Sequence, residues 1–183
     1  MKKTILYSSI ALFIGFVSLS FTSSKVTHKA KTSSSFVEEV APTLKWYTDF
    51  TKANAESTKT GKPIFGFFTG SDWCGWCRKL KAAVFVKDDF KQWADSAVIL
   101  LELDFPRRKK LPAKIAQQNR QLAQLFKVRG YPTVWLFTTT KNAETNQMNV
   151  DAWGQLSYPR AEAGKESQKF IGDALKILAK KKK

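Results

Sequence analysis

Hydrophobic residues come in short runs separated by polar stretches, and these runs predict the elements of an α/β fold. Two runs are almost entirely apolar, over residues 63–69 and 98–104. A continuous apolar run of this length is typical of a strand that is covered on both faces of a sheet. A strand, a helix and a second strand over this distance form a βαβ unit. We therefore expect the two strands to be parallel, with a right-handed crossover.

The rest of the chain alternates between helical and extended patterns. Helical spacing predicts helices over 49–60, 79–85, 88–94, 113–126 and 167–180, and shorter apolar runs predict strands over 44–46, 134–137 and 148–153, the last returning antiparallel. Polar connections are expected over 105–112, 138–146 and 157–165. Thr48 or Asp49 is the expected N-cap of the first helix, and Gly61 follows its end.

Apolar residues at helical spacing predict the faces that two of the helices turn toward the core. In the helix over 113–126 these residues are Ile115, Leu122, Leu125 and Phe126. In the helix over 167–180 they are Phe170, Ile171, Ala174, Leu175 and Leu178. We expect both sets to be buried. The tryptophans Trp46, Trp93, Trp135 and Trp153 are expected to pack in the core or at its rim.

The only two cysteines, Cys74 and Cys77, follow the first buried strand, after a turn rich in glycine, serine and aspartate. A C-x-x-C that opens a helix in this position is typical of a redox pair. Unpaired N–H groups and the positive end of the dipole at a helix start favour a thiolate, so we expect a lowered pKa for Cys74. Cys77 lies one turn further in and is expected to be less exposed. Cys74 would then attack a partner disulfide, and Cys77 would resolve the mixed disulfide.

Other uses of the cysteine pair are less favoured. A disulfide across C-x-x-C closes a very small loop and is a poor structural staple. A zinc site needs four ligands, and the only histidine, His28, lies in a polar N-terminal segment. We expect no metal and no cofactor. No phosphate-binding loop, Ser-His-Asp set or paired carboxylate site stands out in the sequence.

The N-terminus has the pattern of an export signal. Lys2 and Lys3 precede an apolar stretch that runs to Phe21, with small residues that suit cleavage after Ser20 or Ser24. We expect a signal peptide over 1–20, an uncleaved membrane anchor being the alternative. A flexible tether over 21–43, a folded domain over 44–180 and a basic tail over 181–183 complete the expected organisation.

The formal net charge is +16, from 31 basic and 15 acidic residues. Basic residues cluster over 107–110 and 180–183. Such surfaces can attract acidic partners, membrane headgroups or nucleic acid. No nucleic-acid-binding motif accompanies the charge, so we expect no nucleic acid partner and interpret these clusters as solvated surface.

Two motifs and the order of the elements together resemble the thioredoxin family. The motifs are Trp73-Cys74-Gly75-Trp76-Cys77 and the turn Gly130-Tyr131-Pro132-Thr133, and the resemblance covers about 44–180. The chain looks most like exported bacterial thioredoxin-like proteins with a G-S-D-W-C-x-W-C type of site. The resemblance implies a thioredoxin fold, an α/β fold with a central mixed β-sheet and helices on both faces.

The resemblance also assigns roles to individual residues. Cys74 matches the attacking cysteine, Cys77 the resolving cysteine, and Trp73 the tryptophan beside the site. Pro132 matches a proline whose preceding peptide bond is cis, which would place the backbone of Tyr131 beside the sulfurs and let it pair with substrate. Trp73 and Trp76 are candidates for an exposed apolar lip that grips a partner polypeptide.

The chain departs from thioredoxin itself at three positions near the motif. Phe67 stands where thioredoxin has a buried acid, and Leu100 stands near the place of the lysine that partners this acid. Glu102 or Asp104 on the next strand are possible substitutes. Trp76 stands where thioredoxin has proline, so the direction of disulfide exchange is open. Asp72 is expected to form the turn at the helix start, with assistance to proton transfer as the alternative.

The predicted function is that of an exported thiol–disulfide oxidoreductase acting on protein thiols and disulfides. The resemblance favours the reducing direction. The N-terminal signal predicts a periplasmic or secreted location, and we expect an upstream membrane or periplasmic electron donor and a monomer. One alternative is a non-catalytic thioredoxin-fold module that binds a partner through a basic, aromatic face. Another is a dithiol protein for soft metal ions such as Cu(I).

Overall fold

The computed structural model describes residues 41–141 and 148–181. The expected signal peptide, nearly all of the expected tether, His28 and the end of the basic tail lie outside these residues. The elements are β1 (Trp46–Tyr47), α1 (Phe50–Thr60), β2 (Ile64–Thr69), α2 (Gly75–Leu80), the π-helical turn η1 (Lys81–Phe85), α3 (Asp88–Ala97), β3 (Ile99–Asp104), α4 (Ala113–Leu125), β4 (Thr133–Lys141), β5 (Met148–Leu156) and α5 (Glu166–Lys181).

The five strands form one mixed sheet in the order β1-β3-β2-β4-β5. β2 and β3 are parallel, as the βαβ pattern predicts, and Phe67 is level with Glu102 across the pair. β4 runs antiparallel to β2, and β5 returns antiparallel to β4. The central strand β2 is buried along its whole length, which explains its unbroken apolar sequence.

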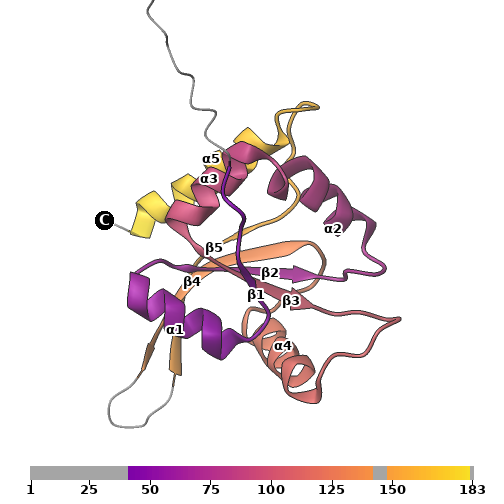
Figure 1. Ribbon diagram of the computed structural model, residues 1–183, viewed down its shortest axis with the longest axis vertical. Coiled ribbons are helices and arrows are strands. Elements are labelled where there is room, and N and C mark those ends of the chain that lie inside the picture. Colours follow the sequence, from indigo (N-terminus) through magenta and orange to yellow (C-terminus); the bar gives the residue numbers. More distant parts are fainter. Residues whose placement is uncertain (1–40, 142–147, 182–183) are drawn as a thin grey trace, which may run out of the picture. The chain divides into compact units, whose positions relative to one another are not determined.

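Helices cover both faces of the sheet, as the resemblance to thioredoxin implies. Helices α2, α3 and α5 lie on one face, and α1 and α4 lie on the other (Figure 1). Alternate residues of β2 face the two layers: Phe65 and Phe67 pack with α2, α3 and α5, whereas Ile64 and Phe68 pack with α1 and α4. Among the described residues, no helix combines the length and the apolar character needed to cross a bilayer.

Helix α1 begins and ends where its sequence predicts. The Asp49 carboxylate accepts hydrogen bonds from the backbone N–H groups of Thr51 and Lys52, and so caps the helix. Gly61 follows the last residue with φ of 71°, a left-handed conformation that a glycine adopts without strain. The chain then turns directly into β2, the strand that leads to the cysteines.

Several boundaries differ from the prediction. β1 is Trp46–Tyr47 rather than 44–46, and α2 gives way to η1 inside the helix expected over 79–85. β4 continues to Lys141 through residues expected in the turn over 138–146, and β5 continues past Gly154. Residues 138–141 pair with β5 as a hairpin arm, so their backbone bonds are satisfied without an apolar sequence. The rest of that expected turn lies outside the described residues.

Two leucines expected in the core are exposed. Leu125 on α4 is 56% exposed, because Asn119, Leu122 and Phe126 form the buried stripe and position 125 lies about 100° around the helix from 126. Leu175 on α5 is likewise exposed, next to the buried Ala174. In both helices the apolar set in the sequence is wider than the face that the sheet covers.

Candidate redox site

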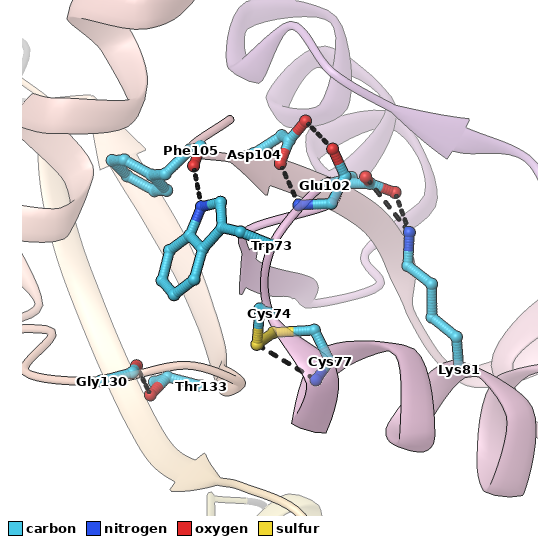
Figure 2. Close-up of a disulfide and its surroundings, with 10 residues drawn as sticks. Trp73, Cys74, Cys77, Lys81, Glu102, Asp104, Phe105, Gly130 and Thr133 are labelled. Atoms are coloured by element: carbon cyan, nitrogen blue, oxygen red, sulfur yellow. Dashed lines mark hydrogen bonds and ion pairs between the residues drawn. A yellow bond between two sulfur atoms is a disulfide. The ribbon is translucent and has the colours of Figure 1, made fainter. Parts of the chain in front are cut away.

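Cys74 and Cys77 form a disulfide at the junction of β2 and α2 (Figure 2). The sulfurs are 2.07 Å apart and the two Cα atoms are 5.3 Å apart. Cys74 is the N-cap residue of α2, and the backbone N–H of Cys77 donates to its Sγ at 3.1 Å. The first sulfur therefore lies where the free N–H groups of the helix start are concentrated.

The two cysteines differ in exposure in the expected order. Cys74 is 5% exposed and Cys77 is 1% exposed, and both belong to the core cluster that contains Phe67 and Leu80. Both residues are thus buried, and Cys74 is slightly the more exposed. This order agrees with the expected roles of Cys74 as the attacking and Cys77 as the resolving cysteine.

The turn before the cysteines depends on Gly70. Its carbonyl accepts hydrogen bonds from the N–H groups of Trp73 and Cys74, at 3.2 and 2.8 Å. A Cβ atom on residue 70 would lie 2.3 Å from the indole of Trp73, far inside contact distance. Only glycine lets the tryptophan lie across the turn. The sequence shows a glycine in this turn, but nothing in the local pattern reveals the indole above it.

Trp73 lies beside the disulfide and is fixed on three sides. Its indole N–H donates to the carbonyl of Phe105 at 2.8 Å, and its ring meets Tyr131 edge to face with centroids 5.6 Å apart. The guanidinium of Arg107 lies 4.0 Å from its ring centroid. Trp73 is therefore a half-buried, hydrogen-bonded support of the site, rather than the freely exposed half of a lip.

The peptide bond between Tyr131 and Pro132 is cis, which confirms the expectation from the resemblance. The Thr133 hydroxyl donates to the carbonyl of Gly130 across this turn at 2.8 Å, and Figure 2 shows the turn beside the disulfide. Tyr131 packs against the cluster that contains both cysteines. Burial raises the pKa of its hydroxyl, so the side chain is neutral at physiological pH.

Trp76 is the exposed aromatic residue of the site, as predicted. It is 56% exposed, its ring contacts Tyr158 with centroids 5.1 Å apart, and the Lys79 ammonium lies 4.5 Å from its ring centroid. An exposed indole on the helix that carries the cysteines offers an apolar contact to a partner. The other four tryptophans, Trp46, Trp93, Trp135 and Trp153, are half-buried, which agrees with packing at the core or its rim.

Asp72 binds a loop rather than capping α2. Its carboxylate accepts the backbone N–H groups of Arg107 at 3.0 Å and Arg108 at 2.7 Å, while Cys74 is the N-cap. The hydrogen bond from Arg107 is the main cause that lowers the pKa of Asp72. Asp72 lies in the turn before α2, as predicted, but its carboxylate binds N–H groups of the chain 35 residues further on, which the sequence did not indicate.

Asp104 anchors the same turn from the end of β3. Its carboxylate accepts the N–H and the hydroxyl of Ser71, at 2.8 and 2.7 Å, and pairs with Lys109 at 3.0 Å. Burial by itself would raise the pKa of Asp104, but the bonds from Ser71 and Lys109 outweigh it and lower the pKa. Its position at the end of an apolar strand was the one sequence signal for this role.

Cys77 lies in an apolar cluster that includes Phe67 and Leu100. Phe67 and Leu100, which the resemblance places at or near the positions of the acid and lysine of thioredoxin, are both buried. Of the possible substitutes, Glu102 pairs with Lys81 at 3.1 Å, and Asp104 is engaged by Ser71 (Figure 2). Both carboxylates near the motif on β3 are therefore already paired. Within the part of the chain that the structure describes, no cluster of three or more metal-ligating side chains occurs.

The amino-acid sequence matches a known protein family. The thioredoxin-like domain matches residues 50–147, and the chain therefore belongs to the thioredoxin-like domain family. Among curated proteins, the disulfide bond reductase DsbH of Chlamydia pneumoniae is 32% identical over 118 residues, which cover 64% of this chain and 70% of DsbH. The thioredoxin-related protein DsbJ of the same organism is 27% identical over 93 residues, 51% of this chain and 27% of DsbJ.

Two solved structures resemble the chain. The structure of a DsbH oxidoreductase superposes with a TM-score of 0.64 at 27% identity and covers 76% of this chain and 87% of that one. A thioredoxin from Thermus thermophilus shares the fold, with a TM-score of 0.53 at 15% identity over 76% of this chain and 90% of its own. With its bonded C-x-x-C pair, the chain is a thiol–disulfide oxidoreductase.

Proposed function

We propose that the protein reduces disulfides in exported polypeptides, with Cys74 as the attacking and Cys77 as the resolving cysteine. The observation that carries the proposal is the Cys74–Cys77 pair at the start of α2, with the N–H of Cys77 directed at the first sulfur. A hydrogen bond to sulfur at a helix start stabilises a thiolate, the form of cysteine that attacks disulfides.

The reaction needs no group beyond the two thiols and the substrate. In the reduced protein, the Cys74 thiolate attacks one substrate sulfur, a mixed disulfide forms, and the other substrate sulfur leaves as a thiolate that takes up a proton. The Cys77 thiolate then attacks Cys74 Sγ and releases the second substrate thiol. Two electrons pass to the substrate, and the protein ends with the disulfide that the structure contains.

Trp73, Trp76, Tyr131 and Pro132 are the proposed substrate-binding residues. The cis turn at Pro132 lies beside the disulfide, where its backbone groups would pair with an extended polypeptide. The exposed indole of Trp76 would supply an apolar contact, and Trp73 holds the turn that carries Cys74.

The direction and the location of the reaction are further parts of the proposal. The name of DsbH, a disulfide bond reductase, supports the reducing direction. The apolar stretch after Lys2 and Lys3 supports export to the periplasm or beyond through a signal peptide over 1–20. The proposed organisation continues with a tether over 21–43, a monomeric domain over 44–180 and a basic tail over 181–183. Such a reductase requires an upstream donor, in the membrane or the periplasm, that returns electrons to the cysteine pair.

Reduction of insulin with a small dithiol as electron source tests the proposal. The wild-type protein is expected to accelerate the reaction, and Cys74→Ser is expected to abolish the acceleration. Reduced Cys77→Ser that has been freed of the dithiol before insulin is added is expected to trap the substrate as a mixed disulfide, because no other thiol is present to resolve it. Equal rates for the wild type and Cys74→Ser would exclude catalysis through this pair and leave the binding-module interpretation.

Equilibration with glutathione tests the direction separately. A reductase is expected to have a midpoint potential at or below the cytosolic glutathione poise, about −220 to −260 mV. A midpoint near that of a strong oxidant, about −120 mV, would reverse the assigned direction while leaving the exchange chemistry intact.

A further inference from the structure

We propose that the redox site selects polypeptides whose disulfide is flanked by acidic side chains, by means of a basic rim around the cysteines. The basic rim is defined by six exposed side chains, Arg78, Lys79, Arg107, Arg108, Lys127 and Arg129. This inference rests on the proposed function and adds to it the chemical class of the substrate.

Two cations of the basic rim lie on the tryptophans of the motif. The guanidinium of Arg107 is 4.0 Å from the ring centroid of Trp73, and the ammonium of Lys79 is 4.5 Å from that of Trp76. Contact with an aromatic face holds each cation in place without neutralising its charge. Each tryptophan that flanks Cys74 and Cys77 in the motif thus carries a positive charge that a substrate carboxylate can reach.

The loop that carries Arg107 and Arg108 is fastened to the turn before the cysteines. Asp72 accepts the backbone N–H groups of both residues, and Trp73 donates to the carbonyl of Phe105. Asp72 binds the backbone rather than the guanidinium groups, so neither arginine side chain is held in an ion pair with it. The loop is positioned by the same turn that positions Cys74.

The carboxylates of the site do not balance the basic rim. Asp72 adds one negative charge beside the six cations, whereas Asp104 is paired with Lys109, and Glu102 with Lys81. Over the described ranges 41–141 and 148–181, none of the six rim residues forms an ion pair. The surface around the disulfide is therefore positively charged, and such a field steers acidic partners toward it.

The basic rim continues along a groove that starts at the cis turn. Lys127 and Arg129 line this open groove of about 790 Å³ together with Tyr131, Pro132 and the exposed Leu125. Apolar surface and two cations in one groove fit a polypeptide in which acidic and apolar side chains are mixed. Charge complementarity favours this occupant over a neutral or basic segment.

Two disulfide-bonded peptides of equal length test the inference, one with glutamate and one with glutamine on both sides of its cysteines. The measured quantity is the ratio of kcat/KM for the acidic peptide to that for the neutral one. The wild-type ratio is expected to exceed one at low salt and to fall toward one at about 0.5 M salt. Arg107→Gln/Arg108→Gln keeps the backbone N–H groups and is expected to lower the low-salt ratio about tenfold.

The matched control is Lys59→Gln/Lys180→Gln, which removes the same charge from exposed positions. Lys59 lies in the last turn of α1, just before β2 begins, and Lys180 lies in the last turn of α5. Both are therefore remote from the end of β2 that leads to the cysteines. Its ratio is expected to stay within about twofold of the wild type. Should the arginine variant unfold, Arg108→Gln alone is expected to lower the ratio about threefold.

Four outcomes would overturn the inference. Two concern the ratio itself: a wild-type ratio of one, and a fall in the lysine control as large as that in the arginine variant. The third is an equal loss of activity toward both peptides in the arginine variant. The fourth is a loss of binding of the arginine variant to anionic lipid vesicles while its peptide ratio stays at the wild-type value. Turnover of the neutral peptide reports on the proposed function by itself. A wild-type protein that reduces neither peptide would therefore contradict the oxidoreductase function, not only the selectivity.

Discussion

At the scale of single residues, the site depends on a glycine whose lack of a side chain leaves room for a tryptophan. Gly70 has no side chain, and the indole of Trp73 occupies the space that a Cβ would fill. The same glycine presents its carbonyl to the N–H of Cys74. One residue thus allows the tryptophan to cover the turn and holds the backbone of the attacking cysteine.

Gly70→Ala is expected to destabilise the protein by about 1–3 kcal/mol, since the new methyl group displaces a packed indole. The free energy of unfolding in urea measures this cost, and the loss of the Trp73 environment is visible in tryptophan fluorescence. The control is Gly172→Ala on α5, where a Cβ meets nothing within 4 Å and the change is expected to stabilise the helix. Equal stability of Gly70→Ala and the wild type would show that the turn has room for a side chain.

The reduced Cys74 is expected to ionise, and so to react as a thiolate, at a lower pH than an ordinary cysteine. In a Cys77→Ser background, the rate of alkylation by iodoacetamide is expected to rise with a midpoint below about pH 8.5, because N–H groups at the start of α2 stabilise the anion. A midpoint at or above that of a free cysteine peptide would remove the basis for assigning the attack to Cys74.

At the scale of elements, the site forms where β2 and β3 end. The two parallel strands end side by side, so the turn that follows β2 meets the residues that end and follow β3. Ser71, Asp72 and Trp73 each bind a partner there, namely Asp104, the backbone of Arg107 and the carbonyl of Phe105. The carboxyl ends of parallel strands are where α/β proteins gather their functional groups, and this site follows that rule.

The bonds at Asp104 predict a loss of stability in acid. A carboxyl whose pKa is lowered on folding stabilises the folded state above its unfolded pKa, about 3.9, and this stabilisation disappears as the pH falls through the lower folded value. Unfolding followed by urea is therefore expected to become easier below about pH 4. Asp104→Asn is expected to cost about 1–3 kcal/mol at pH 7 and to flatten this acid dependence. An unaltered pH profile in Asp104→Asn would assign the acid sensitivity to other carboxyls.

At the scale of the whole molecule, one aromatic cluster joins the central strand to three elements of one face. Phe65 on β2 has ring centroids within about 6 Å of Phe85, Phe90 and Phe170, which belong to η1, α3 and α5. Aromatic pairs in edge or tilted geometry add to the free energy of burial. This cluster holds the helical layer against the sheet below the redox site.

Phe65→Ala is expected to lower the free energy of unfolding by about 3–5 kcal/mol, since it leaves a cavity that touches several rings. Urea unfolding at constant pH measures the change. Leu125→Ala serves as the contrast: its apolar side chain fits the sequence pattern of a core residue yet is exposed, and its cost is expected to stay within about 0.5 kcal/mol. Similar costs for the two variants would mean that the core is not centred on this cluster.

Local periodicity was sufficient to predict most elements, their order and the parallel pairing of β2 with β3. It failed where a pattern is wider than the covered face, as at Leu125, and where a polar hairpin arm pairs through its backbone, as at residues 138–141. For the site, the C-x-x-C pair and the cis turn at Pro132 were predictable from motifs. Asp104, Gly70 and the partner of Asp72 were not, because each acts through a contact that the local pattern does not specify.

The sequence by itself determined the position of the reactive pair: an apolar strand, a turn and a helix start follow from residue types within about twenty positions, where steric and hydrogen-bonding preferences are local. Only the tertiary structure decided what surrounds that pair. Trp73, Asp72 and Ser71 meet partners more than thirty residues away because two parallel strands end together. The basic rim also depends on the tertiary structure, since its residues come from three separate segments that only folding brings to the cysteines.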